Sequence, residues 1–388
     1  MAALADRGGG SAAAAGVKAA TLGTAVDELL RRRLDANERF FEAEADRIAR
    51  LCLELAQRFA RGGRLLAIGG SSQAWSDAHH VAVEFVHPVI VGKRALPALA
   101  LSADEVELLA EPDDALVAFE PLRFTAGDEW LFEPSTDDPF VAQELAETLY
   151  HVLWELVHVF FDHLGGSAAG AGASDFLYPF LAEQARDLEP VVADVRSSAL
   201  MKAQEVSALR EQTLTEGRDE LAAAATSVRA ALEHGGTLLA FGNGGSATDA
   251  MDVVADFESA PLGWPRRRAI DLAADSAILT ALANDIGPEV MFARQLIAYG
   301  RPGDIALALS TSGNSSNIVE GLAEARRRRL RTVAMVGYDG GRVAAEGLAD
   351  HVIVSRSEHI PRIQEAQASA YHVLRELVEG AGKRPAAS

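Results

Sequence analysis

A group of hydroxyl side chains after an apolar stretch is the most specific chemical signal in the sequence. The segment DIALALSTSGNSSNIVEGLAEA has the pattern of a buried strand followed by a helix that we expect to begin near Asn317. Four hydroxyl residues crowd the turn between them: Ser310, Thr311, Ser312 and Ser315. Hydroxyl groups and the free N–H groups of a helix N-terminus can bind a phosphate without any lysine. The simpler alternative is an ordinary Ser/Thr-rich turn that caps a helix.

The overall charge favours small anions held by local donors over large polyanionic partners. The 388-residue chain carries a formal net charge of −20, which repels nucleic acids and anionic membrane surfaces. A phosphate group must therefore be held by hydroxyl and backbone N–H donors at one place. We expect a small-molecule ligand, no nucleic acid and no membrane partner.

The ends and the apolar stretches of the chain indicate a cytoplasmic location. Residues 1–20 are rich in Ala and Gly, lack a basic start and a sustained apolar stretch, and are predicted to be a disordered tail. The most apolar helical stretch, residues 149–161, is too short to cross a bilayer. The single cysteine, Cys52, lies in an apolar-periodic run and is expected to be buried and reduced.

Two halves of the chain repeat one pattern of elements. RLLAIGGSSQAWSDAHHVAVEF in the first half and TLLAFGNGGSATDAMDVVADF in the second each place an apolar strand before a Gly/Ser turn and a helix. Residues 150–157 (YHVLWELV) and 371–378 (YHVLRELV) agree at seven of eight positions. Strand, glycine loop and helix form one unit of a doubly wound fold. We therefore predict an α/β protein with two doubly wound parallel-sheet domains flanked by helices.

The second domain is predicted to be complete and the first to be truncated. The second half continues with strands AIDLAA, DIALALS, RTVAMVG and DHVIVS, whereas the first half lacks room for about one βαβ unit and has no STSGN counterpart. The predicted boundaries are residues 21–165 for the degenerate domain, 166–175 for a linker and 176–383 for the complete domain. Residues 183–233 are expected to be mostly helical, with an interruption at Pro190.

These motifs resemble those of bacterial sedoheptulose 7-phosphate isomerases, which contain a sugar-isomerase (SIS) domain. STSGNS before a helix, GNGGS after an earlier strand, AND ending at Asp285 and PRIQEAQASAYH carry the resemblance, which covers roughly residues 191–382. It implies an aldose–ketose isomerase that works through an enediol. It also implies that Ser310, Thr311, Ser312 and Ser315 hold the substrate phosphate, while the remaining sugar contacts come from Asn243, Gly244, Ser246, Asp285 and Gln364.

The resemblance also implies a zinc site and a general acid–base pair. Family members carry a His and a Glu four residues apart on one helix, and a Gln and a His eight residues apart on the C-terminal helix, spacings that keep each pair on one helix face. The first half has this complete set, and the second half has a changed one: His80, Glu84, Gln143 and His151; Asp252, Asp256, Gln364 and His372. Asp256 is one methylene shorter than Glu, and Asp252 replaces imidazole with a harder oxygen ligand. The structural alternative for the first-half set is that these are polar groups of the core or of an interface.

Three hypotheses follow from the two halves. The first is an isomerase whose pocket draws on both halves, with either Asp256 and His372 or Glu84 and His151 moving protons. The second is a non-catalytic sugar-phosphate- or metal-binding regulator or assembly factor derived from the isomerase. The third, deamination or amino-group transfer, is weaker because no amidotransferase domain accompanies the chain. Because the family forms four-domain assemblies, we expect a homodimer.

Overall fold

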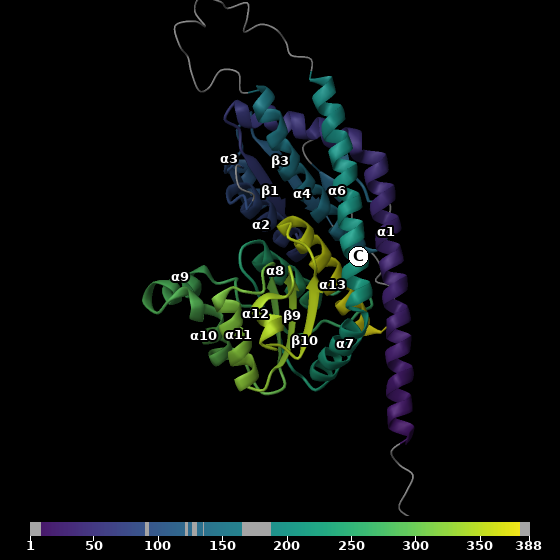
Figure 1. Ribbon diagram of the computed structural model, residues 1–388. Helices are drawn as coiled ribbons and strands as arrows, with labels where there is room; N and C mark the ends of the chain where they lie inside the picture. The colour runs from purple at the N-terminus through teal and green to yellow at the C-terminus, as the bar shows by residue number, and fades with distance from the viewer. Residues whose placement is uncertain are drawn as a thin grey trace, which may run out of the picture. The chain divides into compact units, whose positions relative to one another are not determined.

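The computed structural model describes residues 9–89, 93–120, 123–125, 130–134, 136–164 and 188–380 (Figure 1). The chain divides into two compact units that are discontinuous in sequence. The first-half unit consists of residues 36–137 and 142–206, and the second-half unit of residues 1–35, 138–141 and 207–388. Three helices contribute residues to both units: α1 (Gly9–Ala60), α4 (Pro139–Leu164) and α6 (Glu189–Glu216). The predicted linker at residues 166–175 lies outside the described residues.

The second-half unit contains a five-stranded sheet in the order β10-β9-β8-β6-β7. The strand pairs of this sheet are parallel, which fits strands separated by helical crossovers. The strands are β6 (Leu238–Phe241), β7 (Ala269–Asp271), β8 (Ile305–Ser310), β9 (Arg331–Gly337) and β10 (His351–Ser355). The helices after α6 are α7 (Arg218–Glu233), α8 (Gly245–Glu258), α9 (Ser276–Asp285), a 3-10 turn (Pro288–Val290), α10 (Met291–Tyr299), α11 (Ser316–Arg327), α12 (Gly341–Ala345) and α13 (Ile360–Glu379).

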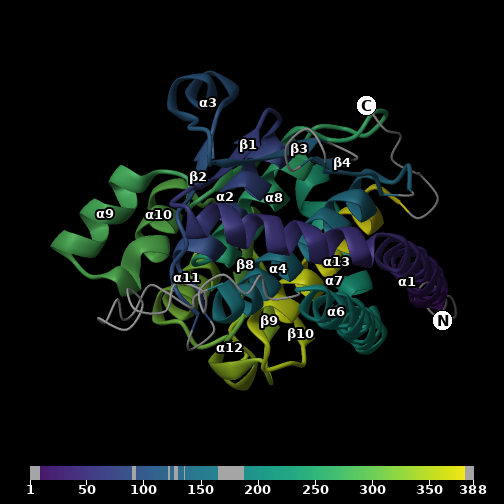
Figure 2. The ribbon, with the colours of Figure 1, turned by 90° about the horizontal axis from the view of Figure 1, so that it is seen from above.

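Strand residues of this sheet alternate between two buried cores. Leu238 and Ala240 of β6 pack with α7, α8, α13 and the start of α1, whereas Leu239 and Phe241 pack with α10 and α11. Figure 2 shows β8, β9 and β10 with α11 on one side and α7 and α13 on the other. Burial on both faces explains why the central strands β6 and β8 are almost entirely apolar. The predicted complete doubly wound domain is confirmed.

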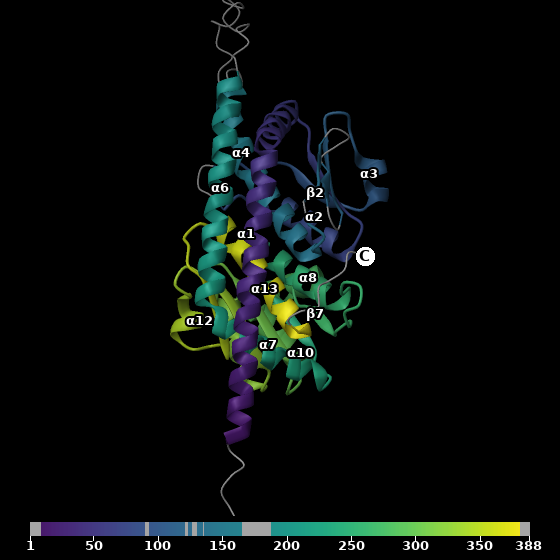
Figure 3. The same cartoon turned by 90° about the vertical axis from the view of Figure 1, so that its right-hand side faces the viewer.

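The first-half unit repeats the beginning of this architecture and then departs from it. Its sheet has the order β2-β1-β3-β4-β5, and β1 pairs in parallel with β2 and β3. β4 and β5 then pair antiparallel where the other unit places α11 and β9. The elements are β1 (Leu65–Gly69), α2 (Ser72–Val86), β2 (Ala98–Leu101), α3 (Ala103–Leu109), β3 (Ala115–Glu120), β4 (Arg123–Thr125), β5 (Leu131–Phe132) and α4; Figure 3 shows β2 with α2 and α3. This unit is therefore α/β with a mixed sheet, and no phosphate-type loop follows β3 among its described residues.

Three local predictions are refined by the structure. Helix α1 begins at Gly9, within the predicted tail, and residues 1–8 lie outside the described residues. Pro190 lies in the first turn of α6, where proline is tolerated, and the break falls instead at Gly217 between α6 and α7. Cys52 is fully buried as predicted. Among the described residues, no helix is both long and apolar enough to cross a membrane.

Candidate functional site

The strand order places two loops of the second-half unit at a topological switch point. From β6 the chain moves outward to β7, whereas β8 lies on the opposite side of β6 and leads to β9 and β10. In open α/β sheets, ligands bind outside the carboxyl ends of the strands where the order reverses. The two loops that follow β6 and β8 are the glycine-rich loop and the hydroxyl-rich loop predicted to bind the sugar and the phosphate.

The hydroxyl-rich loop is held in a tight, glycine-dependent turn. Gly313 has φ +62°, and a Cβ there would lie 2.3 Å from the carbonyl oxygen of Gly340. The Ser310 hydroxyl accepts a hydrogen bond from the Gly313 N–H at 3.1 Å, and the Ser312 hydroxyl accepts one from Asn314 at 3.2 Å. Ser315 is the N-cap residue of α11, yet its side chain makes no capping hydrogen bond to the helix. The Ser315 hydroxyl therefore lies at the N-terminus of α11 without capping the helix.

The glycine-rich loop presents a second helix N-terminus beside the first. Gly244 is the N-cap residue of α8 with φ +57°, and Ser246 lies buried in the first turn. Asn243 and Asn317 exchange two side-chain hydrogen bonds, at 2.9 and 2.8 Å, and so tie this loop to the first turn of α11. Two adjacent helix N-termini provide N–H donors and positive dipole ends suited to an anion.

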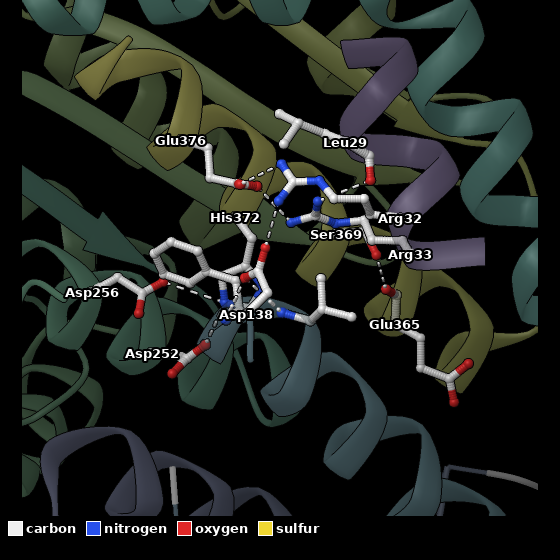
Figure 4. Close-up of polar contacts among 12 residues, drawn as sticks. Leu29, Arg32, Arg33, Asp138, Asp252, Asp256, Glu365, Ser369, His372 and Glu376 are labelled. Carbon is white, nitrogen blue, oxygen red and sulfur yellow. Dashed lines mark hydrogen bonds and ion pairs between the residues drawn. The ribbon is translucent and has the colours of Figure 1, made fainter. Parts of the chain in front are cut away.

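A cluster of acidic and imidazole groups lies between α8 and α13. We call Asp252, Asp256 and His372 the second-half cluster (Figure 4). The His372 Nε2 atom is 3.4 Å from Asp252 Oδ2 and 3.3 Å from Asp256 Oδ2, and all three side chains are buried. Tyr371 donates its hydroxyl proton to Asp252 at 2.9 Å. Helix α13 also connects to the phosphate loop, because Gln367 donates to the Ser310 carbonyl oxygen at 3.3 Å.

The electrostatics of this cluster suit proton transfer near neutral pH. Burial raises the pKa of Asp256 to about 6, and the Asp252 carboxylate acts in the same direction, while His372 and Arg375 oppose them. Arg375 is itself buried and donates to the Asp256 main-chain oxygen at 3.1 Å and to Glu379 at 2.6 Å. Its guanidinium lies over the Phe257 and Trp264 rings, at 4.6 and 4.9 Å from their centroids.

The first-half unit contains a related group, which we call the first-half cluster: His80, Glu84 and His151. It lies between α2 and α4, the counterparts of α8 and α13. His80 Nε2 is 3.9 Å from Glu84 Oε1, and the His80 and His151 ring centroids are 5.0 Å apart. The Tyr150 hydroxyl is 2.9 Å from His80 Nδ1, just as Tyr371 contacts Asp252 in the other unit. Gln143 lies on the same helix as His151 and donates to Asp77 at 3.1 Å.

Both clusters group residues that could hold a metal ion, but their chemistry differs. In each cluster the candidate ligand atoms lie within 4.8 Å of one another. Burial, followed by the nearby His151, holds the pKa of His80 well below its usual value, so His80 is neutral and ready to bind a metal at pH 7. Two imidazoles and one carboxylate fit zinc, whereas two carboxylates and one imidazole are a harder set closer to the preference of Mg²⁺ or Mn²⁺.

The structure separates one predicted site residue from the others and adds several that were not predicted. Among the described residues, Asp285 has a hydrogen bond only with Asn284 and lies exposed at the end of α9. Gln364 is buried on α13 two turns before His372. The added residues are Tyr150, Tyr371, Asn317 and Gln367. The two tyrosines could have been found from the repeated Tyr-His pair, whereas Asn317 and Gln367 have no sequence signal.

Comparisons with known proteins identify similar sequences and a similar fold. Residues 203–337 match the SIS domain family. The phosphoheptose isomerase of Chlorobium phaeobacteroides is 43% identical over 178 residues, which cover 45% of this chain and 78% of the relative. The phosphoheptose isomerase of Aquifex aeolicus is 42% identical over 158 residues, which cover 39% of this chain and 79% of that relative.

A solved structure matches residues from both units. The C-terminal domain of glucosamine-fructose-6-phosphate aminotransferase from Francisella tularensis matches 92% of this chain and 95% of its own, with a TM-score of 0.55 and 10% identity. At this level of identity the similarity concerns the fold alone.

Proposed function

Because the chain belongs to the family of SIS-domain phosphoheptose isomerases, we propose that its second-half unit isomerises a ketose phosphate, represented by sedoheptulose 7-phosphate, to the aldose phosphate. The observation that carries this proposal is the pairing of two helix N-termini at the switch point through Asn243 and Asn317. That pairing combines a phosphate-type loop with a sugar-type loop. Helix α13 then links the loop to the proton-transfer groups through Gln367.

The phosphate anchor and the substrate class follow from the loop. In the proposal, Ser310, Thr311, Ser312 and Ser315 hold the phosphate together with the α11 N-terminus. Asn243, Gly244 and Ser246 contact the sugar, and so does Gln364. Asp285 is exposed, so in this proposal it contacts the sugar only when the substrate is bound. A phosphorylated sugar fits such a site because one end is an anion and the other a chain of hydroxyl groups.

The second-half cluster supplies the acid–base chemistry in this proposal. The Asp256 carboxylate takes a proton from C1 of the open-chain ketose, the carbonyl oxygen O2 gains a proton, and an enediol results. The proton then returns to C2 while the O1 hydroxyl loses its proton, which leaves an aldehyde at C1. A base with a pKa of about 6 is well matched to this step at neutral pH. In this proposal His372, which lies next to both carboxylates, moves a proton between O1 and O2 of the sugar.

Zinc is the metal that the family implies, and the first-half cluster fits it. His80, Glu84 and His151 would hold the ion, with Gln143 on the same helix as His151. Zinc bound there would stabilise the first-half unit. The second-half cluster would hold a metal through Asp252, Asp256 and His372, with Gln364 as a further donor. We also propose that two chains associate into a homodimer with four SIS-type domains, which multi-angle light scattering would test.

A non-catalytic role in binding a sugar phosphate or metal, as a regulator or assembly factor, is the second candidate. It is favoured by the two aspartates in the second-half cluster and by the burial of that cluster, where His372 is 1% exposed. In this case the phosphate loop would bind its ligand, and the cluster would contribute to stability instead of turnover.

Turnover separates the two functions. Purified protein is incubated with sedoheptulose 7-phosphate, with and without zinc, and aldose formation is followed by NMR while bound metal is measured on the same sample. Isomerisation that is lost in both His372→Ala and Asp256→Asn, with ligand binding retained, supports the isomerase and assigns it to the second half. Loss only in His151→Ala or Glu84→Gln would assign the chemistry to the first half. Binding without turnover in the wild-type protein would favour the non-catalytic role.

A further inference from the structure

An aromatic side chain from the first half of the sequence covers the second-half cluster. Phe140, in the first turn of α4, belongs to the short segment 138–141 that is part of the second-half unit. Its ring centroid is 5.0 Å from that of His372, with the planes inclined by 31°, and 5.7 Å from that of Trp264. Phe140 is 2% exposed, so it is seated in the unit and does not project into solvent.

The cluster behind Phe140 is closed. The Nε2 edge of His372 faces the two aspartates, the Tyr371 ring lies edge-on at 4.6 Å, and Phe140 lies over the imidazole. A sugar carbon must come within about 3.5 Å of the acid–base groups to react. Something must therefore move before a substrate can reach them. Tyr371 is fixed by its hydrogen bond to Asp252, whereas the Phe140 ring is apolar and is held by packing alone.

A small ionic network holds the segment that carries Phe140. Asp138 caps α4 by accepting from the N–H groups of Phe140 and Val141 at 3.2 and 3.4 Å. Arg32 of α1 donates to Asp138 at 3.0 Å and to Glu376 of α13 at 3.4 Å, and Glu376 also accepts from the buried Arg33 at 2.9 Å (Figure 4). The Arg32 side chain is 28% exposed, so its pairing with Asp138 is a weak latch of the surface type. The Arg33–Glu376 pair is buried and forms the fixed part of the network.

We propose that Phe140 is a lid over His372 and that the Arg32–Asp138 ion pair latches it. The closed arrangement excludes the sugar and water from the second-half cluster, and withdrawal of the first turn of α4 admits the substrate. This inference rests on the proposed isomerase site only for its consequence for turnover, because the exposure of His372 can be measured by itself. It also gives the first half of the chain a role in the second-half site.

The test measures access to His372 directly. Wild-type protein and the variants Phe140→Ala and Arg32→Ala are treated with diethyl pyrocarbonate, and modification of the His372 peptide is followed by mass spectrometry at pH 6, 7 and 8. We expect modification at least about tenfold faster in Phe140→Ala, because the ring that covers His372 is gone, and an intermediate rate in Arg32→Ala, because loss of the latch raises the population of open states. The pH series separates access from changes in protonation. Phe292→Ala, which empties the core on the opposite face of the sheet, controls for general loosening.

Each outcome decides one claim. If His372 reacts at the wild-type rate in both variants, or if Phe292→Ala accelerates it as much as Phe140→Ala does, the lid is excluded. Circular dichroism shows whether Phe140→Ala still folds. If it does not, the test rests on Arg32→Ala, which removes only a partly exposed cation. With sedoheptulose 7-phosphate we expect kcat/KM to rise several-fold in Phe140→Ala. Faster modification without turnover in any variant would leave the lid standing and overturn the isomerase.

Discussion

The first-half and second-half clusters occupy matching places in the two units but carry different charges. Each lies between the helix after a glycine-rich loop and a helix with a Tyr-His pair, and in each the tyrosine hydroxyl contacts the first residue of the cluster. That residue is the neutral His80 in one unit and the carboxylate Asp252 in the other. The same helix scaffold therefore supports either a zinc-type or an acidic set of side chains.

A second difference between the two units balances the negative charge of the second-half cluster. Repeat alignment places Trp154 of the first half where the second half has Arg375, and both side chains are buried. The acidic cluster thus has a buried cation beside it, whereas the cluster with two imidazoles has an aromatic ring. Buried charges are tolerated only when paired, so we infer that the acidic cluster depends on Arg375, which interacts electrostatically with Asp256.

Replacing Arg375 is expected to change the stability of the protein more than any other substitution proposed for the two clusters. Arg375→Met removes the donor to the Asp256 main-chain oxygen and leaves the Asp256 carboxylate buried without the nearby guanidinium, while Glu379 keeps its ion pair with Arg267; the free energy of unfolding should fall by about 3–5 kcal/mol. Urea unfolding followed by circular dichroism measures the change. The double variant Asp252→His with Arg375→Trp, which copies the first half, should recover about 1–3 kcal/mol.

Arg356→Met is the matched control, because Arg356 forms an ion pair with Glu216 in which both side chains are half exposed. Its loss should cost less than about 1 kcal/mol. An equally small loss in Arg375→Met would show that the buried guanidinium does not balance the acidic cluster.

Metal affinity should differ next most strongly between the halves. We expect His80→Ala to weaken zinc binding by more than about 100-fold, since loss of a direct ligand exceeds the loss of an outer-shell partner. His372→Ala should change zinc affinity by less than about tenfold, because the second-half cluster is rich in oxygen ligands. Competition titration with a zinc indicator measures both. His79→Ala, one residue away on the same helix but outside the cluster, should bind zinc as the wild type does; the reverse ranking of His80 and His372 would place zinc in the second half.

The two units should also respond oppositely to pH. Asp271 at the end of β7 stands where the first half has Ala100, and burial raises the pKa of Asp271 to about 6. The folded state then binds more protons than the unfolded state between about pH 4 and 6, so this contribution to stability is present below pH 4 and is lost as the pH rises through 6. Asp271→Asn should gain on the order of 2 kcal/mol relative to wild type between pH 4.5 and 7.5.

Asp114 of the first-half unit should make stability depend on pH in the opposite direction. Burial raises its pKa, but the hydrogen bonds from Arg64 and from the Glu111 N–H outweigh this and hold the pKa below the usual value. Its contribution is present above the ordinary Asp pKa and is lost on acidification, so Asp114→Asn should be least stable relative to wild type near neutral pH. Urea midpoints across the pH range test both variants, and parallel curves for wild type and Asp271→Asn would contradict the assignment.

Much of the second-half unit could be predicted from the sequence, because its signals are local. Apolar strands buried on both faces, such as Ile305–Ser310, end at glycine and hydroxyl turns whose chemistry is set within a few residues. The cluster residues were expected from the family resemblance, whose spacings of four and eight keep each pair on one helix face. The Asn243–Asn317 pair could not be predicted in the same way, since 74 residues separate two amides that only the sheet order brings together.

The first-half unit was less predictable because its departures depend on tertiary packing. The antiparallel pair β4–β5 is formed by strands of three and two residues, which are too short for a periodic pattern. The assignment of residues 138–141 to the second-half unit, with Phe140 on His372, likewise has no local signal. For Asp285 the family motif predicts a sugar contact, and the structure shows the residue exposed at the end of α9.

The smallest expected difference concerns one hydroxyl group at a helix N-terminus in each unit. Ser315 caps α11 without donating or accepting a side-chain bond to the helix, whereas Ser102 in the first half completes a capping box with Glu105 in α3. Ser315→Ala should therefore leave the unfolding free energy within about 0.5 kcal/mol and weaken sedoheptulose 7-phosphate binding by about tenfold, the loss of one hydrogen bond to a charged group. Ser102→Ala should cost about 1 kcal/mol of stability and leave binding unchanged. Isothermal titration calorimetry and urea unfolding measure the two effects. If Ser315→Ala instead lost stability and kept its affinity, the hydroxyl-rich loop would be an ordinary helix cap and the phosphate would have to bind elsewhere.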